Sequence, residues 1–284
     1  MLSNLKLITK ERKQNDRMIL QILKQLIKKF FNIFGLEVRR GTKDRRCCLV
    51  GSLQQIKNLG FIPATVIDVG AAVGSFTLQC YNIFPHSKYL LLEPLYENRE
   101  YLDKVTKAIP NAEYILAVAA AEPGKVTLNV HSDLFGSSLY FEKEVDLNGV
   151  PRNVPAVTLD DLCKERGVSG PYLIKVDVQG AELDVLSGAR RTLDKTEYVI
   201  LEVSLFQFVK GGPQLYDVVK FMNLHGFVIY DIFGLNYRPL DDALAQVDIA
   251  FVKESSQFRK YHIYTNKKQR EELTKRMLLF RGRH

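Results

Sequence analysis

Residues 66–76 read Val-Ile-Asp-Val-Gly-Ala-Ala-Val-Gly-Ser-Phe, an apolar strand that runs directly into a glycine-containing turn and the start of a helix. Gly70 and Gly74 have no Cβ, so the backbone of the turn can approach a ligand closely. Asp68 stands near the carboxyl end of the strand, where open α/β sheets bind their ligands. This stretch predicts the first βα unit of a ligand-binding α/β fold.

Short β-branched runs alternate with helical patterns from Thr65 onward, which is typical of a largely parallel sheet covered by helices. The expected strands are 65–70, 88–93, 112–118, 172–177, 197–203, 226–231 and 247–252. The expected helices are 75–84, 94–109, 159–166, 180–193 and 213–225. The last two strands are joined by a short segment rich in loop formers, so the final strand is expected to be antiparallel. The prediction is a Rossmann-like, seven-stranded α/β sheet.

Residues 119–157 interrupt this alternation. A turn at 122–125 is followed by two short apolar runs, 126–130 and 138–141, which together predict an inserted β-ribbon. The polar loop between the two runs contains His131. We expect this loop to form a lid over the bound ligand.

The two ends of the chain differ from its middle in charge. Residues 1–46 contain 13 lysines and arginines against four acidic residues, and residues 253–284 contain ten against three, although the whole chain carries only +8. The middle is therefore net acidic, which argues against a surface built for nucleic acid along its length. The expected organisation is a basic helical extension at 1–60, a catalytic domain at 61–253 and a basic tail at 254–284.

An amphipathic helix is expected at 15–34, because apolar residues recur there at every third or fourth position with lysines between them. Its expected role is that of an accessory helix packed on the domain, and the alternative is peripheral contact with a membrane surface or a partner. No signal peptide and no transmembrane stretch is expected. The four cysteines form no C-x-x-C pair, so a reducing, cytoplasmic setting is expected.

A second acidic residue, Glu93, follows the next apolar run in Leu91-Leu92-Glu93-Pro94. A carboxylate at this position can accept hydrogen bonds from both hydroxyls of a ribose. The turn after the first strand lacks the third glycine of a pyrophosphate-binding G-x-G-x-x-G sequence. Asp68 would also repel a pyrophosphate, whereas it suits a cationic sulfonium. The pattern therefore favours S-adenosylmethionine, with a nicotinamide dinucleotide as the alternative.

Residues 173–182 repeat the arrangement of strand, polar cluster and helix, and the strand after them delivers a further carboxylate to the same edge. The polar residues expected to converge beside the methyl group are Lys175, Asp177, Glu182 and Glu202. A hydroxyl acceptor must lose its proton as the methyl group arrives, so one of these carboxylates, or His131, is expected to act as general base. A divalent ion held by the acidic residues ranks below a direct base. Glu182 could instead be a favourable charge at a helix N-terminus, and Lys175 a salt-bridge partner.

These segments resemble the FkbM family of methyltransferases. The resemblance is carried by 66–77, 92–94, 117–119, 137–138, 158–160 and most specifically by Lys175-Val176-Asp177-Val178-Gln179-Gly180-Ala181-Glu182. It spans about residues 62–253 and implies a class I methyltransferase fold that uses S-adenosylmethionine and often methylates hydroxyls of sugars or natural products. Family members commonly have Glu where Gln179 stands here, so this chain lacks one carboxylate that could hold a metal.

The resulting prediction is an S-adenosylmethionine-dependent O-methyltransferase that acts on a hydroxyl of a sugar, glycan or natural product. The alternatives are a nicotinamide-dependent oxidoreductase and a nucleic-acid methyltransferase, although nucleic acid is not expected because no N-P-P-Y-like or Pro-Cys motif is present. No metal ligand is expected. The expected cofactor-binding residues are Asp68, Gly70, Ala71, Gly74, Ser75, Phe76, Glu93, Pro94, Ala117, Val118 and Asp177.

Overall fold

The computed structural model of the chain describes residues 44–143 and 148–281. The helix expected at 15–34 therefore lies outside the described residues. Within the described ranges, no helix combines the length and the apolar character that crossing a membrane requires.

The main sheet has seven strands in the order β3-β2-β1-β7-β8-β10-β9. Its strands are β1 (Thr65–Val69), β2 (Lys88–Leu92), β3 (Ala112–Ile115), β7 (Tyr172–Val176), β8 (Thr196–Ser204), β9 (Phe227–Tyr237) and β10 (Leu244–Lys253). Neighbouring strands from β3 to β8 are parallel, and β10 runs antiparallel to both β8 and β9. This confirms the predicted mostly parallel, Rossmann-like sheet with one antiparallel strand.

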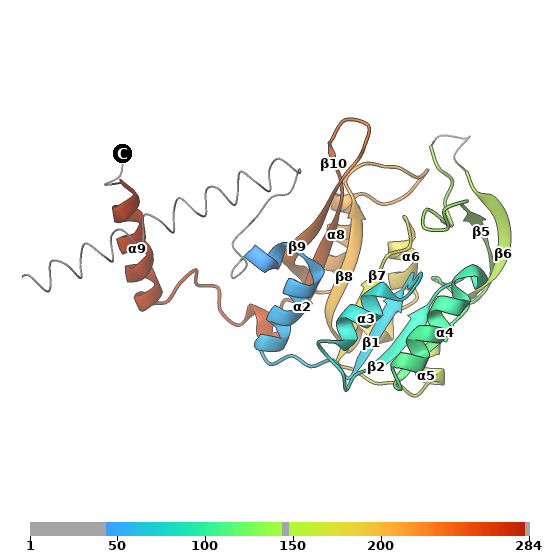
Figure 1. Cartoon of the computed structure of the whole chain (residues 1–284), viewed down its shortest axis with the longest axis horizontal. Helices are drawn as coiled ribbons and strands as arrows, with labels where there is room; N and C mark the ends of the chain where they lie inside the picture. The colour runs from blue at the N-terminus through green and yellow to red at the C-terminus, as the bar shows by residue number, and fades with distance from the viewer. Residues whose placement is uncertain (1–43, 144–147, 282–284) are drawn as a thin grey trace, which may run out of the picture. The chain divides into compact units, whose positions relative to one another are not determined.

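Helices cover both faces of the sheet (Figure 1). One face is covered by α2 (Leu49–Asn58), α3 (Ser75–Tyr81) and α4 (Arg99–Ala108), the last preceded by the short 3-10 helix η2 (Tyr96–Asn98). The other face is covered by α5 (Leu159–Glu165), α6 (Glu182–Ser187), α7 (Arg190–Asp194) and α8 (Leu215–Leu224). The remaining helical elements are the 3-10 helices η1 (Asp44–Cys47) and η4 (Gln257–Arg259) and the helix α9 (Lys267–Arg281).

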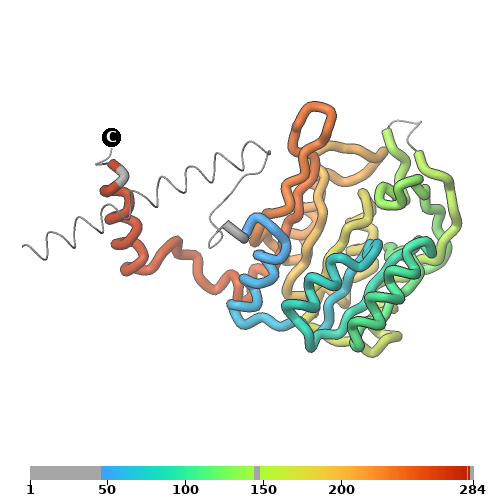
Figure 2. Tube along the Cα trace, in the orientation of Figure 1, coloured from blue at the N-terminus to red at the C-terminus, as the bar shows by residue number. Residues whose placement is uncertain are grey.

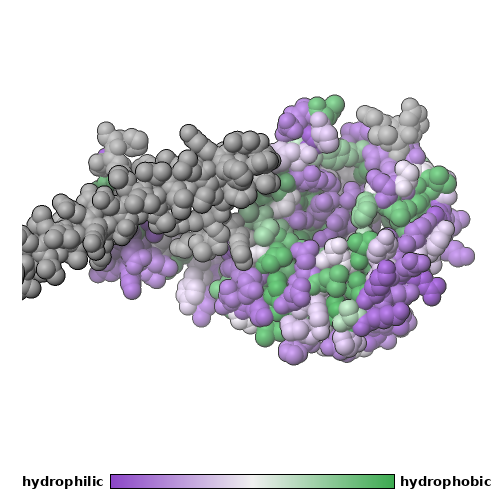
Figure 3. Space-filling model, in the orientation of Figure 1, coloured by the Kyte–Doolittle hydropathy of each residue, from purple (hydrophilic) through white to green (hydrophobic). Residues whose placement is uncertain are grey.

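Two hydrophobic clusters hold the layers together, because successive residues of a strand point to opposite faces. Ile67 and Ile174 are buried with the α5–α8 layer, whereas Val66 and Leu173 are buried with the α2–α4 layer. The outward face of α4 is strongly hydrophilic (Figure 3). Helix α2 contributes fully buried leucine and isoleucine side chains to the second cluster, so the core includes residues that precede position 61.

The insertion forms a separate three-stranded sheet in the order β4-β6-β5. These strands are β4 (Val118–Ala119), β5 (Gly124–Val130) and β6 (Val150–Val157). The predicted β-ribbon is present, but its second strand was predicted wrongly. β5 pairs with β6, whereas the run 138–141 contributes an isolated bridge between Ser138 and Asn129. Pro151 and Pro155 obscure β6 in the sequence, yet the strand tolerates them because, among the strands that the structure describes, β5 alone pairs with that stretch.

The helix expected at 180–193 is instead two helices, α6 and α7, separated at Gly188. A Cβ at Gly188 would lie 2.1 Å from the carbonyl oxygen of Ala120, so the chain passes too close to its neighbour for a larger residue. Strands β9 and β10 are joined by a loop and form an antiparallel hairpin, which confirms the expected connection. This hairpin extends beyond the carboxyl edge of the sheet (Figure 2). The insertion and the segment 205–213 rise from the same edge and are joined by backbone hydrogen bonds between Lys143 and Phe208 and between Lys210 and Phe141.

Candidate functional site

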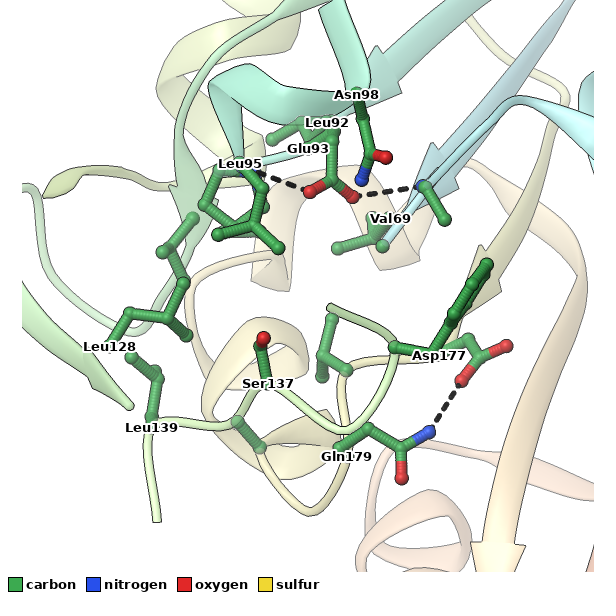
Figure 4. Close-up of a pocket in the computed structure, with 18 of the residues that line it drawn as sticks. Val69, Leu92, Glu93, Leu95, Asn98, Leu128, Ser137, Leu139, Asp177 and Gln179 are labelled. Carbon is green, nitrogen blue, oxygen red and sulfur yellow. Dashed lines mark hydrogen bonds between the residues drawn. The ribbon is translucent and has the colours of Figure 1, made fainter. Parts of the chain in front are cut away.

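A cleft of about 280 Å³ opens at the carboxyl ends of β1, β2, β7 and β8. Figure 4 shows Glu93 and Asn98 on one side of it and Asp177 and Gln179 on the other. Leu128, Ser137 and Leu139 of the insertion close a third side. The predicted cofactor-binding residues that line this cleft are Gly70, Glu93, Pro94, Ala117, Val118 and Asp177. The predicted residues that do not line it are Asp68, Ala71, Gly74, Ser75 and Phe76.

The turn after β1 is held against both neighbouring strands. The N–H groups of Gly70 and Ala71 each donate to the carbonyl oxygen of Leu92 at 3.0 Å. Gly70 has φ +78°, and a Cβ there would lie 1.9 Å from the carbonyl oxygen of Asp177. Only glycine fits between the ends of β1 and β7, so the floor of the cleft at this point is bare backbone.

Glu93 is 4% exposed and accepts two backbone hydrogen bonds. Its Oε2 accepts from Ala72 N–H and its Oε1 from Leu95 N–H, both at 2.9 Å. Burial raises the pKa of the Glu93 carboxyl, although these hydrogen bonds and the Asn98 side chain act in the opposite direction. Asn98 was not predicted from the sequence. The available signal was its position at the start of a helix, five residues after Glu93.

Asp68 lies beneath the turn and not in the cleft. Its Oδ2 accepts a hydrogen bond from Thr77 Oγ1 at 2.7 Å, and its Oδ1 has no hydrogen-bond partner among the described residues. Burial raises the pKa of Asp68, while attraction from Lys175 acts against that rise. Asp68 therefore supports the turn by fixing it to Thr77 of α3.

The end of β7 carries an ion pair and an amide bridge. Lys175 Nζ donates to Asp177 Oδ2 at 2.7 Å, the salt bridge considered as the alternative for this lysine. Burial alone would lower the pKa of Lys175, but the carboxylates of Asp177 and Asp68 together raise it. Gln179 Nε2 donates both to Asp177 Oδ1 at 3.2 Å and to Glu202 Oε2 at 3.1 Å. The glutamine thus links the ends of β7 and β8.

Glu202 lines the cleft at the end of β8. Its Oε2 accepts a second hydrogen bond from Gln246 Nε2 of β10 at 2.8 Å. Burial, followed by repulsion from Asp177, raises the pKa of Glu202 to about 8. Gln246 was also missed in the sequence. It lies on β10, which pairs with β8 in a register that places Gln246 opposite Ser204, 42 positions earlier in the chain. A pairing over this distance leaves no local signal.

Three predicted catalytic residues do not line the cleft, namely Glu182, His131 and Lys175. The Glu182 side chain is buried at the start of α6, where its Oε1 accepts from Gly180 N–H at 3.0 Å. His131 is half-buried in the insertion, and its backbone N–H donates to Ser137 Oγ at 3.1 Å. Of the five predicted catalytic residues, only Asp177 and Glu202 line the cleft, while Lys175 contacts the cleft residue Asp177.

Burial raises the pKa of Glu182 from 4.5 to about 7, which predicts a pH-dependent loss of stability. The protonated form is favoured in the folded state, so the stabilisation is complete below pH 4.5 and is lost as the pH rises through 7. The free energy of unfolding of Glu182→Gln, measured relative to that of the unmodified protein, should therefore increase by about 3 kcal/mol as the pH rises from 4.5 to above 7.

Urea unfolding at pH 4.5 and pH 8 measures this gain. Glu165→Gln is the matched control, because the Glu165 side chain is 70% exposed and its removal relieves no burial. An equal difference between Glu182→Gln and the unmodified protein at both pH values would contradict the prediction.

The glycine turn after β1, the buried acidic residue after β2 and the polar ends of β7 and β8 define a Rossmann-like protein with its ligand cleft at the carboxyl edge of the sheet. Residues 68–229 match the methyltransferase FkbM domain. The chain therefore belongs to the FkbM methyltransferase family, as the sequence predicted.

One curated relative is the 2-O-methyltransferase NoeI of Sinorhizobium fredii (strain NBRC 101917 / NGR234), which is 43% identical over 72 residues. That match covers 25% of this chain and only 30% of the relative. Among solved structures, methyltransferase FkbM from Methylobacillus flagellatus KT has a TM-score of 0.42 and 16% identity, over 66% of this chain and 43% of that one. A Burkholderia thailandensis 1,6-didemethyltoxoflavin-N1-methyltransferase with bound S-adenosylhomocysteine has a TM-score of 0.42 and 9% identity, over 74% and 79%.

Proposed function

We propose that the chain is an S-adenosylmethionine-dependent O-methyltransferase whose acceptor is a hydroxyl of a sugar, glycan or natural product. Membership of the FkbM family and the relative named as a 2-O-methyltransferase support this proposal. The observation that carries it is the composition of the cleft. Glu93, a buried carboxylate suited to ribose hydroxyls, and Glu202, a carboxylate of raised pKa suited to accept a proton, line the same cavity.

The lining fits the nucleoside part of S-adenosylmethionine. Each oxygen of Glu93 accepts one backbone hydrogen bond, and the carboxylate has further lone-pair capacity to accept a ribose hydroxyl. Leu95 and Val118 provide apolar walls, and Gly70 keeps the floor free of a side chain. When bound, the cofactor supplies a methyl group whose bond to sulfur breaks as a bond to the acceptor oxygen forms.

Glu202 is the residue that we assign as general base. Both amides that hold it, from Gln179 and Gln246, donate to Oε2. Among the residues that the structure describes, none donates a hydrogen bond to Oε1, so this oxygen is available to take the proton of an acceptor hydroxyl. A pKa near the working pH is what an efficient general base requires, and burial raises that of Glu202 to about 8.

Asp177 is the weaker choice for this role. One of its oxygens accepts from the Lys175 ammonium and the other from Gln179, so each oxygen already has a hydrogen-bond donor of the protein. We assign Asp177 to positioning: it orients the Gln179 amide, which in turn orients Glu202.

Calorimetric titration with S-adenosylhomocysteine and, separately, with NAD tests the cofactor assignment. We expect a saturable heat with the first ligand and none with the second, because the cleft lacks the third glycine of a pyrophosphate turn. Heat with NAD alone would favour the oxidoreductase alternative. Incubation with labelled S-adenosylmethionine and fractionated glycans, followed by identification of the methylated atom, then tests the acceptor class. Transfer to nitrogen or carbon would exclude the O-methyltransferase.

A further inference from the structure

A second cavity of about 270 Å³ lies beside the cleft, over the carboxyl end of β8 and the β9–β10 hairpin. Gln179 lines both cavities, so they meet at this residue. The second cavity is formed by the segment 205–213 on one side and by residues 236–239 of the hairpin on the other. The mechanism described above leaves this space without a role.

A continuous set of amide hydrogen bonds connects the two cavities through the assigned base. Gln246 donates to Glu202 from its Nε2 at 2.8 Å and accepts from Asn236 Nδ2 on its Oε1 at 3.3 Å. Glu202 lines the first cavity, whereas Gln246 and Asn236 line the second. The assigned base is therefore hydrogen-bonded to two residues that line the second cavity, Gln179 and Gln246.

The order of the strands places the two cavities on opposite sides of their meeting point at Gln179. Glu93 stands on the β2 side, followed across the sheet by β1, β7, β8 and β10. A nucleoside held at Glu93 leaves the β8 and β10 side for the acceptor. An acceptor in the second cavity approaches Glu202 from the side opposite Glu93.

The lining of the second cavity is aromatic and amide-rich. Phe206 and Tyr237 offer apolar ring faces, and Gln207 and Asn236 offer amide donors and acceptors. This combination suits a ring with apolar C–H faces and hydroxyls at its edge.

The charges of this cavity disfavour an acidic ligand. Arg238 lies 4.0 Å from the Phe206 ring centroid and is bound by both oxygens of Asp241, at 2.7 and 2.6 Å, so its charge is already paired. Glu142, the other charged residue of the lining, is acidic.

We propose that the second cavity is the acceptor subsite and that it binds a neutral sugar ring, with the reacting hydroxyl directed to Glu202. This inference rests on the proposed methyl transfer, since the cavity is assigned by its position relative to the cofactor cleft. Tyr237 is 54% exposed at the end of β9, so the loss of its ring should affect the bound sugar more than the fold.

The test uses the full chain with S-adenosylhomocysteine and a panel of methyl glycosides of neutral hexoses and 6-deoxyhexoses, beside the matched uronic acids. Saturation-transfer NMR measures glycoside binding, and calorimetry measures binding of S-adenosylhomocysteine. We expect neutral glycosides to bind the unmodified protein and Tyr237→Ala to weaken that binding by about tenfold. Gln207→Ala, a second variant on the opposite wall, should weaken it as well.

Tyr216→Ala is the matched control, because Tyr216 is 68% exposed on α8 and lines neither cavity. All three variants should bind S-adenosylhomocysteine as the unmodified protein does. Equal glycoside binding by Tyr237→Ala and Gln207→Ala, preference for uronic acids, or no binding of any neutral glycoside would overturn the subsite while leaving the cofactor assignment intact. Failure of the unmodified protein to bind S-adenosylhomocysteine would instead overturn the proposed function.

Discussion

Glu202→Gln is expected to lower the turnover rate of methyl transfer by about 10²–10⁴-fold, the usual contribution of a general base. Glutamine has the shape of glutamate, and its carbonyl oxygen can still accept from Gln179 and Gln246, so the ends of β7, β8 and β10 should stay in place. The amide cannot take the proton of the acceptor hydroxyl. Binding of S-adenosylhomocysteine, measured by calorimetry, should therefore be unchanged while labelled methyl transfer is lost.

The pH profile distinguishes this role from a structural one. A general base must be unprotonated, and the pKa of Glu202 is raised to about 8, so turnover of the unmodified protein should increase as the pH rises through 7 toward 8. The residual activity of Glu202→Gln should lack this increase.

Asp248→Asn is the matched control for Glu202→Gln. Asp248 is a carboxylate opposite Glu202 on β10, and burial raises its pKa to about 6, but it lines neither cavity. Its replacement should keep the increase of turnover with pH but move it to lower pH, because the Asp248 charge contributes to the raised pKa of Glu202. A Glu202→Gln variant that turns over at the unmodified rate would remove Glu202 from the reaction.

The distinction between Asp177 and Glu202 illustrates what the sequence can and cannot predict about this site. Both residues end apolar runs, and parallel strands end at one edge of a sheet, so their proximity followed from local pattern alone. Their difference depends on which oxygens are already occupied. That occupancy is decided by Lys175, which is close in sequence, and by Gln246 on β10, which the local pattern around Glu202 does not reveal.

The same limit applies to the insertion and to the second cavity. The run 126–130 was recognisable as a strand, but its partner β6 begins 20 residues later and contains two prolines, so neither periodicity nor proximity indicated the pairing. The second cavity is assembled from the 205–213 segment, which lies almost entirely outside the expected strands and helices, and from residues 236–239, which were expected in the loop between the last two strands. Tertiary contacts between segments without a periodic signal determine both features.

Glu93→Ala is expected to weaken binding of S-adenosylhomocysteine by about 1–3 kcal/mol, the cost of leaving buried hydrogen-bonding groups unpaired. The substitution removes the acceptor for the ribose hydroxyls and also releases the N–H groups of Ala72 and Leu95. Calorimetric titration at a temperature well below unfolding measures the loss. Glu97→Ala is the matched control, since Glu97 is a nearby carboxylate that pairs with Arg152 and does not line the cleft.

A thermodynamic cycle separates direct contact with the ribose from loosening of the turn. Removal of the ribose 2′-hydroxyl from S-adenosylhomocysteine should weaken its binding to the unmodified protein and to Glu97→Ala, because a buried acceptor on Glu93 loses its donor. The same 2′-deoxy ligand should bind Glu93→Ala as well as the complete ligand does, because the acceptor is already absent. If Glu93→Ala still discriminates between the two ligands to the full extent, Glu93 acts only by holding the turn after β1, and the ribose must be recognised elsewhere in the cleft.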